Sequence, residues 1–510
     1  MSSTKIMTAH EAVRIIKDRD VIAVCGCENL LTAEMTLQAL EESFVKTGHP
    51  RNLTEYHLVI YGMGPRLGLE HFAHEGMATR SVGSGFSYLK SSKMTQMIRE
   101  EKIEACVVPM GTMYQMMQNI ATGMEYTLTK VGINTFVDPR IEGGSLNSVT
   151  PNNTADVVEF KGETYLCYKN PTINIAIIRG TTADEYGNIS LEEEPVTLGI
   201  MSLAMAAKAC GGKVIAQVKR LAKTGTLHPH SVIVPGIMVD AVVVDENQSY
   251  SGGEKLNPAL TGEVRMPLSK MDALPLNIEK VILRRAAKEI GEAPKTVNLG
   301  VGIPIGVPRI VLEEGLFDGI TFFPEHGSLG GVPGDRSIFG TNINPEAIID
   351  PTDVFRYFCG GGLDVTFLGC GQIDRYGNVN VSKFNGIIPG CGGFIDIVYR
   401  TKKLVFCGPF TSGGLIAHVS GGGIAIEKEG KFKKIIPEVE QITLSSKNAS
   451  QQGQKVFYVT ERAVFELGPR GIVLTEIAPG VDLQKNILDL IEFTVEVSPS
   501  LKKMDKALFL

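Results

Sequence analysis

The chain repeats part of its own sequence after 190 residues, and this repeat limits the possible folds more than any other feature. The letters DEYGN at 184–188 recur as DRYGN at 374–378. The same offset relates IAII at 175–178 to VTFL at 365–368, and KVIA at 213–216 to KLVF at 403–406. Three ordered matches indicate two related halves. Each copy reads as a buried strand, a polar turn and a second apolar strand, which is typical of a parallel sheet.

The beginnings of the two halves also correspond. VIAV at 21–24 leads into Cys25-Gly26, and TVNL at 296–299 leads into GVG at 300–302. Apolar residues at helical spacing then predict helices over about residues 32–44 and 307–314. Strand, glycine turn and helix form the unit of a Rossmann-like sheet, which binds ligands at the carboxyl ends of its strands. We therefore predict an α/β fold with two tandem, related Rossmann-like open-sheet domains, residues 1–275 and 276–510, whose boundary lies in the turn-rich segment 248–275.

Charge and cysteine content exclude several classes of protein. The net charge is -6 and the basic residues are scattered, so we expect no nucleic-acid binding. No apolar stretch approaches the length of a membrane helix, and the N-terminus lacks the apolar core of a secretion signal. The nine cysteines include no CxxC pair, and the histidine pairs 71/74 and 228/230 have no zinc-site pattern. We expect reduced thiols, no metal, no membrane contact and a cytoplasmic location.

A glycine-rich loop after an apolar run contains the most informative carboxylate. The run ITFF at 320–323 leads into PEHGSLGGVPG, in which Glu325 is the only acidic residue before Gly334. Glycines beside a reactive group let backbone donors and a bulky substrate approach without clashes with a Cβ atom. By itself such a loop is more often a turn that a glutamate caps.

Ordered segments over nearly the whole chain resemble the family I coenzyme A transferases, in particular the long single-chain, propionate CoA-transferase-like members. In the first half these segments are HFAHEG at 71–76, FVDPR at 136–140, RGT at 179–181 and VPGI at 234–237. In the second half they are NPEAIID at 344–350, GGGLD at 360–364, NVNVSK at 378–383 and GCGGF at 390–394. The resemblance implies an enzyme that transfers coenzyme A from a short-chain acyl-CoA to a free carboxylate such as acetate, propionate or butyrate. It also implies that the halves are fused equivalents of the α and β subunits of two-chain relatives.

The resemblance assigns roles to individual residues. Glu325 is at the position of the family's catalytic glutamate, which forms a glutamyl-CoA thioester and gives ping-pong kinetics, as expected for a carboxylate nucleophile. By the same analogy, Gly361 and Gly362 donate N–H groups to the glutamyl carbonyl. The turn from Gly26 to Asn29 faces them.

Two departures from the family pattern concern the acyl pocket. Met110 stands where many relatives have a glutamine, and His326 stands where they have a small or amide residue. Both are expected to line the pocket.

Several functional alternatives remain at this level. An acyl-CoA hydrolase on the same fold would let water discharge the intermediate, and a non-catalytic homologue would only sense a CoA ligand. A dinucleotide-dependent oxidoreductase is disfavoured, because GVG at 300–302 does not continue into a complete GxGxxG fingerprint. For the transferase we expect no cofactor beyond coenzyme A as substrate, and a homodimer or homotetramer.

Overall fold

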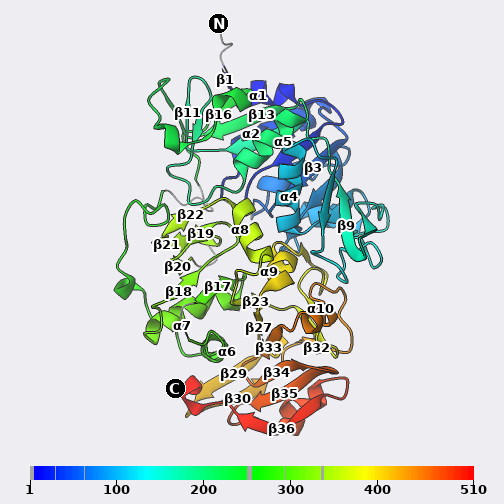
Figure 1. The fold of residues 1–510 in the computed structure, drawn as a ribbon, viewed down its shortest axis with the longest axis vertical. Helices are drawn as coiled ribbons and strands as arrows, with labels where there is room; N and C mark the ends of the chain where they lie inside the picture. Colours follow the sequence, from blue (N-terminus) through cyan, green and yellow to red (C-terminus); the bar gives the residue numbers. More distant parts are fainter. Residues whose placement is uncertain (1–4, 29, 63, 250–255, 293–294, 335–337) are drawn as a thin grey trace.

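Two eight-stranded sheets, stacked along the long axis of the molecule, form the framework of the protein (Figure 1). The computed structural model describes residues 5–28, 30–62, 64–249, 256–292, 295–334 and 338–510. The strands of the first sheet lie between residues 6 and 244, and those of the second between residues 295 and 503. The predicted α/β fold with two tandem open sheets is confirmed.

The first sheet is parallel throughout. Its central strand β10 (Ile175–Arg179) is buried along its whole length, as expected for a parallel strand covered on both faces. In spatial order the strands are β1 (Ile6–Met7), β16 (Ala241–Val244), β13 (Lys213–Val218), β10, β2 (Val21–Val24), β3 (Leu53–His57), β4 (Ala78–Gly83) and β6 (Glu104–Val107).

The second sheet repeats this parallel core and then extends it. From β18 to β33 its strands are parallel, β33, β34 and β35 pair antiparallel, and β36 runs parallel to β35. The spatial order is β18 (Ile320–Phe322), β17 (Lys295–Leu299), β23 (Val365–Gly369), β27 (Lys403–Cys407), β33 (Lys455–Val459), β34 (Ala463–Gly468), β35 (Gly471–Ile477) and β36 (Glu496–Lys503). The order β3, β2, β10, β13, β16 therefore corresponds to β18, β17, β23, β27, β33.

The repeated turns have the same hydrogen bonds in both halves. Asp184 Oδ1 accepts the N–H groups of Tyr186 and Asn188, and its Oδ2 accepts Asn188 Nδ2 at 2.8 Å. Asp374 makes the same three bonds, with the N–H groups of Tyr376 and Asn378 and with Asn378 Nδ2, each at 2.9 Å. The turns join β11 (Thr182–Asp184) to β12 (Ile189–Ser190), and β24 (Gln372–Asp374) to β25 (Val379–Asn380). The internal repeat is thus a repeat of structure.

Helices cover the sheets where the sequence pattern predicted them. The helices expected over 32–44 and 307–314 are α2 (Glu34–Thr47), which ends at the left-handed Gly48, and α7 (Val307–Glu313). Within the described ranges, no helix combines the length and the apolar composition that a membrane crossing requires. The other α-helices are α1 (Ala9–Ala12), α3 (Lys93–Arg99), α4 (Met110–Ala121), α5 (Ile200–Ala209), α6 (Ile278–Ala287), α8 (Pro351–Cys359), α9 (Phe394–Arg400), α10 (Ser446–Gln451) and α11 (Leu483–Asn486).

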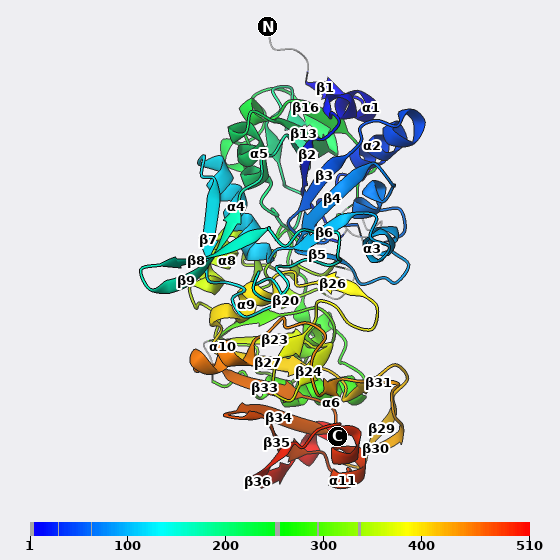
Figure 2. The same ribbon diagram turned by 90° about the vertical axis from the view of Figure 1, so that its right-hand side faces the viewer.

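The halves are joined through their backbones midway along the molecule. Strand β5 (Gly85–Ser87) of the first half pairs antiparallel with β26 (Ile388–Gly390) of the second, and the two lie side by side in Figure 2. The Met110 N–H at the start of α4 donates to the Gly392 carbonyl at 3.0 Å. These bonds fix the edge of one half against the other and leave a cavity beside them.

Candidate active site

Glu325 lies just beyond the carboxyl end of β18, where its side chain is held by a neighbouring strand. The residue is 8% exposed. Asn298, near the end of β17, donates from Nδ2 to Glu325 Oε2 at 3.3 Å and to the Phe323 carbonyl at 3.1 Å. The Asn298 Oδ1 in turn accepts the Thr366 hydroxyl of β23 at 2.9 Å. Residues of three adjacent strands and the loop after β18 therefore orient one carboxylate near the carboxyl edge of the sheet.

The backbone after Glu325 requires a glycine. Gly327 has a φ of 103°, and a Cβ atom there would lie 1.9 Å from the Ile349 carbonyl oxygen. A side chain at this position would push the loop away from β22 (Ala347–Ile348) and displace Glu325.

Glu325 faces a cavity of about 260 Å³ that both halves enclose. Its walls are mainly apolar, and no lysine or arginine is among the described residues that line it. Besides Glu325 the lining residues are Cys27, Glu28, Val59, Ile60, Ser84, Tyr88 and Met110 from the first half and Gly300, Val301, His326, Phe339, Leu368, Gly369, Cys370, Gly371, Val381, Phe384, Gly390, Cys391, Gly392, Gly393, Phe394 and Ile397 from the second.

The two expected acyl-pocket residues both line this cavity. Met110 is 1% exposed and begins α4. His326 is 2% exposed, and its ring packs edge-on against Phe339 with the ring centres 5.3 Å apart. Burial lowers the pKa of His326, although the nearby Glu325 opposes this effect, so the imidazole is neutral near pH 7. Its Nδ1 has no hydrogen-bond partner among the described residues.

Of the expected turn in the first half, only part can be placed. Asn29 lies outside the described residues. Gly26 does not line the cavity: a Cβ atom there would lie 2.9 Å from Thr32 Oγ1 and 2.9 Å from Tyr61 Cβ. Gly26 therefore permits close packing, and the residue of this turn that presents a polar side chain to Glu325 is Glu28.

The structure does not bring Gly361 and Gly362 to Glu325. Their N–H groups donate to the carbonyls of Phe358 and Tyr357, at 2.9 and 3.0 Å, and so close the C-terminal end of α8. They precede β23 and lie at its amino end, whereas the cavity is at the carboxyl ends of these strands. The expectation that these two glycines donate to the glutamyl carbonyl is corrected accordingly.

Other backbone N–H groups line the cavity instead. Val301 and Gly393 are both lining residues, and no described hydrogen bond uses the N–H of either one. The sequence signal for these two N–H groups was their position, because GVG at 300–302 follows β17 and Gly393 precedes α9.

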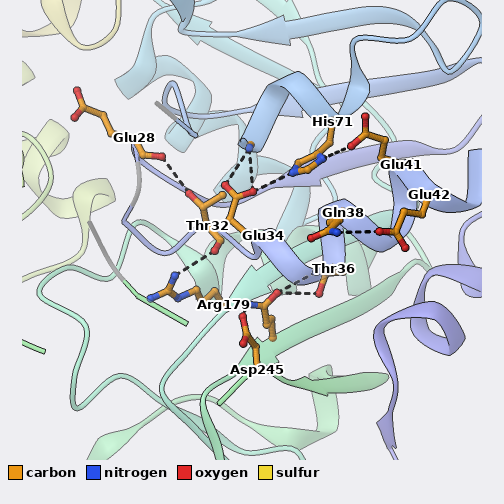
Figure 3. A network of polar contacts seen from close by, with 12 residues as sticks. Glu28, Thr32, Glu34, Thr36, Gln38, Glu41, Glu42, His71, Arg179 and Asp245 are labelled. Atoms are coloured by element: carbon orange, nitrogen blue, oxygen red, sulfur yellow. Dashed lines mark hydrogen bonds and ion pairs between the residues drawn. The ribbon is translucent and has the colours of Figure 1, made fainter. Parts of the chain in front are cut away.

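A buried polar network supports the turn that carries Glu28 (Figure 3). Thr32 Oγ1 donates to the Glu28 carbonyl at 3.2 Å, and Arg179 Nη1 donates to the Thr32 carbonyl at 3.2 Å. Glu34 on α2 accepts the Gly68 N–H at 2.9 Å. The Glu28 carboxylate points away from this network.

The histidine pair 71/74 has a structural role beside this network. His71 bonds Glu34 through Nε2 at 3.0 Å and Glu41 through Nδ1 at 2.6 Å, and His74 Nε2 bonds Glu41 at 2.5 Å. These contacts attach η2 (Gly68–Phe72) to α2. They do not extend to the cavity.

Comparison with known proteins identifies close relatives over the full length. Residues 6–245 match the family described as Coenzyme A transferase. Over 99% of its length the chain is 42% identical to caffeate CoA-transferase of Acetobacterium woodii, of which it covers 97%, and 40% identical to acetate CoA-transferase YdiF of Escherichia coli (strain K12), of which it covers 95%.

Solved structures agree with the sequence matches. The crystal structure of the acyl-CoA transferase YdiF apoenzyme from Escherichia coli O157:H7 superposes with a TM-score of 0.94 at 39% identity, covering 99% of this chain and 96% of that one. A structure of the same enzyme described as a thioester complex with CoA gives a TM-score of 0.93 at 39% identity, with the same coverage.

Proposed function

Because the chain belongs to the family I coenzyme A transferases, and so transfers coenzyme A to carboxylates, we propose that Glu325 is the nucleophile that carries coenzyme A between donor and acceptor. The proposed donor is a short-chain acyl-CoA, and the proposed acceptor is acetate, propionate, butyrate or a similar acid. The observation that carries this proposal is the Asn298-held carboxylate of Glu325 facing a cavity closed by both halves. The relative described as a thioester complex with CoA supports a thioester intermediate here.

The exchange proceeds through two acyl transfers. The Glu325 carboxylate attacks the thioester carbonyl of the donor, and the C–S bond breaks to give a mixed anhydride and the coenzyme A thiolate. The thiolate then attacks the glutamyl carbonyl, and the donor acid leaves as a carboxylate. The acceptor carboxylate reverses these steps on the glutamyl thioester, so donor and acceptor use one site in turn. No proton is gained or lost overall, and no cofactor beyond coenzyme A is required.

The cavity suits a short acyl chain. Its volume of about 260 Å³ is near the lower end of the range of ligand sites. Met110, Phe339 and Phe384 line it with apolar surface. The predominantly apolar walls disfavour water beside Glu325, where water would hydrolyse the thioester.

We propose Val301 and Gly393 as the donors to the oxyanions. Each tetrahedral intermediate develops a negative oxygen, and fixed N–H donors are the usual way to stabilise it. Both N–H groups belong to the cavity wall and are free of described hydrogen bonds. They come from turns that flank strand and helix ends, so the backbone holds them in place.

The test is the intact mass of the enzyme after it is mixed with acetyl-CoA or propionyl-CoA and no acceptor. We expect an adduct of coenzyme A less one water on the peptide that contains Glu325, and we expect added acetate to remove it. Glu325→Gln should form no adduct. The matched control Glu346→Gln changes an exposed glutamate in the same half and should form the adduct like the wild type.

Two results would contradict the proposal. An adduct that maps to another residue would displace Glu325 as the nucleophile. Release of free coenzyme A at the same rate with and without an acceptor would indicate a hydrolase.

We further propose two domains, residues 1–275 and 276–510, in a homodimer or homotetramer located in the cytoplasm. The separate sheets, with strands ending at residue 244 and resuming at residue 295, support this division. All nine cysteines are free, which suits a reducing compartment.

A further inference from the structure

Glu28 is a second carboxyl group in the cavity, and it comes from the opposite half to Glu325. It follows β2 and the Cys25–Cys27 turn with a φ of 50°, a left-handed conformation that is uncommon for a residue with a side chain. Its backbone is fixed, because its N–H donates to the Ile60 carbonyl at 2.6 Å and its own carbonyl accepts Thr32 Oγ1 at 3.2 Å. Such conformations persist where the surroundings enforce them, and they concentrate at functional sites.

The Glu28 side chain has no partner within the described structure. None of the described hydrogen bonds or ion pairs involves its carboxylate oxygens, and neither lysine nor arginine occurs among the described lining residues. The nearest ring nitrogen in the lining belongs to His326, which is neutral near pH 7. Burial, and then the charge on Glu325, raise the pKa of Glu28 to about 7. A partly buried carboxyl group without a partner is costly, so its presence in an otherwise apolar wall points to a ligand group that pairs with it.

The exchange reaction leaves this carboxyl group unused. Carboxylates and a thiolate are both the attacking and the leaving groups, so no step requires an acid or base. Glu28 is therefore free to contact the part of the substrate that does not react.

The reaction also changes the charge that Glu28 faces. When Glu325 becomes a thioester it loses its negative charge, and the repulsion that favours protonated Glu28 disappears. The pKa of Glu28 therefore falls in the state that receives the acceptor acid, and ionisation of Glu28 becomes easier although its burial still opposes the charge. An ionised carboxylate in this cavity needs a hydrogen-bond donor or a cation as its partner.

We propose that Glu28 determines acceptor specificity by binding a hydrogen-bond donor, a hydroxyl or an ammonium group, on the acyl chain of the incoming carboxylate. This inference rests on the proposed function of Glu325. A site that hydrogen-bonds a substrate group rejects the analogue without it, because the protein group is then left unpaired. The enzyme is thus selective for hydroxylated or amino-substituted short-chain acids over plain alkyl acids of equal size.

The test compares three acceptors of similar size: 3-hydroxypropanoate, 3-aminopropanoate and butanoate. Each is added to enzyme charged with coenzyme A from acetyl-CoA, and kcat/KM for discharge of the adduct is measured. Glu28→Leu should lower the ratio of either polar acceptor to butanoate by roughly tenfold or more. Glu28→Gln keeps an acceptor oxygen but no charge, so it should lower the ratio only for 3-aminopropanoate if the ammonium is the natural partner. If the natural partner is a hydroxyl, the ratio of each polar acceptor to butanoate in Glu28→Gln should stay within about threefold of the wild-type ratio.

The outcomes separate this inference from the proposed function. Ratios in Glu28→Leu that stay within twofold of the wild type overturn the role of Glu28, provided the adduct still forms. Adduct formation by each variant shows that its fold and nucleophile are intact. Failure of the wild-type enzyme to form any adduct would instead overturn the proposed function itself.

Discussion

At the scale of single residues, Asn298 fixes the direction of the Glu325 carboxylate. It is fully buried, and its two functional atoms are used by Glu325, Phe323 and Thr366. Hydrogen bonds to charged groups contribute about 1.5–3 kcal/mol. The nucleophile is therefore oriented before a substrate arrives.

Replacement of Asn298 tests this orientation. We expect Asn298→Ala to slow adduct formation from acetyl-CoA by about tenfold or more, because the carboxylate then samples unproductive directions. Rapid-quench mass measurement gives the rate. Thr366→Val removes only the bond behind Asn298 and should have a smaller effect, and equal effects would indicate a general loss of packing.

A second residue-scale prediction concerns pH. Because burial and Glu325 raise the pKa of Glu28 to about 7, Glu28 is protonated below that pH and ionised above it. Once Glu325 carries coenzyme A its charge is gone, so Glu28 ionises at or below pH 7. The preference for 3-aminopropanoate over butanoate should therefore rise between roughly pH 5 and pH 8, where the ammonium stays charged.

The other titratable groups of the cavity do not produce this dependence. Burial raises the pKa of the three lining thiols and lowers that of His326, so these four groups stay neutral near pH 7. The Tyr88 phenol is also neutral there, because the ordinary pKa of a tyrosine is about 10. Any effect of Glu325 that is common to both acceptors cancels in the ratio of kcat/KM for 3-aminopropanoate to kcat/KM for butanoate. A Glu28→Leu enzyme should give a flat ratio, and a rising ratio in that variant would assign the titration elsewhere.

At the scale of elements, α9 of the second half caps α4 of the first. Asp396 on α9 is 1% exposed, and its Oδ2 accepts the Gly111 N–H of the first turn of α4 at 2.9 Å. A Cβ atom on Gly111 would lie 2.6 Å from Asp396 Oδ1, so a glycine is needed there. The start of α4 also carries Met110 into the cavity, so this cap holds part of the active site.

Removal of the cap should lower stability. We expect Asp396→Ala to reduce the free energy of unfolding by about 1–3 kcal/mol, because a buried N–H loses its partner and the helix loses its cap. Urea denaturation measures the change. Asp353→Ala, on the exposed side of α8, breaks only a surface ion pair with Arg356 and should change stability by less than about 0.5 kcal/mol. Equal losses in both variants would contradict the capping role.

The glycine triplet at 360–362 shows why element boundaries matter for a site prediction. The letters GGG suit a helix end and a ligand loop equally well, and the sequence does not show which one occurs. The triplet precedes a strand, however, while Glu325 follows one. In a parallel sheet these positions lie at opposite edges, so the sheet prediction already argued against bringing them together.

At the scale of the whole molecule, the repeat made the fold predictable. The matches at 175–178 and 213–216 are buried strands of the eight-stranded sheet, and the match at 184–188 is a turn of a separate four-stranded sheet. Buried strands and positive-φ turns tolerate few sequences, so these segments kept their similarity. Glu325 was placed at the end of a strand by the apolar run 320–323 that precedes it, and its role was inferred from the family resemblance. The extension of the second sheet by β34, β35 and β36 has no counterpart among the described strands of the first half, so the repeat gave no guide to it.

Glu28 was missed because its role depends on the contact between the halves. Its own neighbours in sequence form an ordinary strand and turn. Backbone contacts between the halves, such as the pairing of β5 with β26, close the cavity that Glu28 and Glu325 line from opposite halves. Long-range contacts of this kind leave no local pattern.

The location of the cavity at the junction also has a consequence for the newly made chain. Domains generally fold in turn as they emerge from the ribosome. The first sheet has all of its strands once residue 244 has appeared, but the cavity needs residues up to Ile397. The reactive glutamate is thus synthesised well before the walls that shield it from water. We therefore expect an incomplete chain that ends before Ile397 to lack part of the cavity wall and to be inactive.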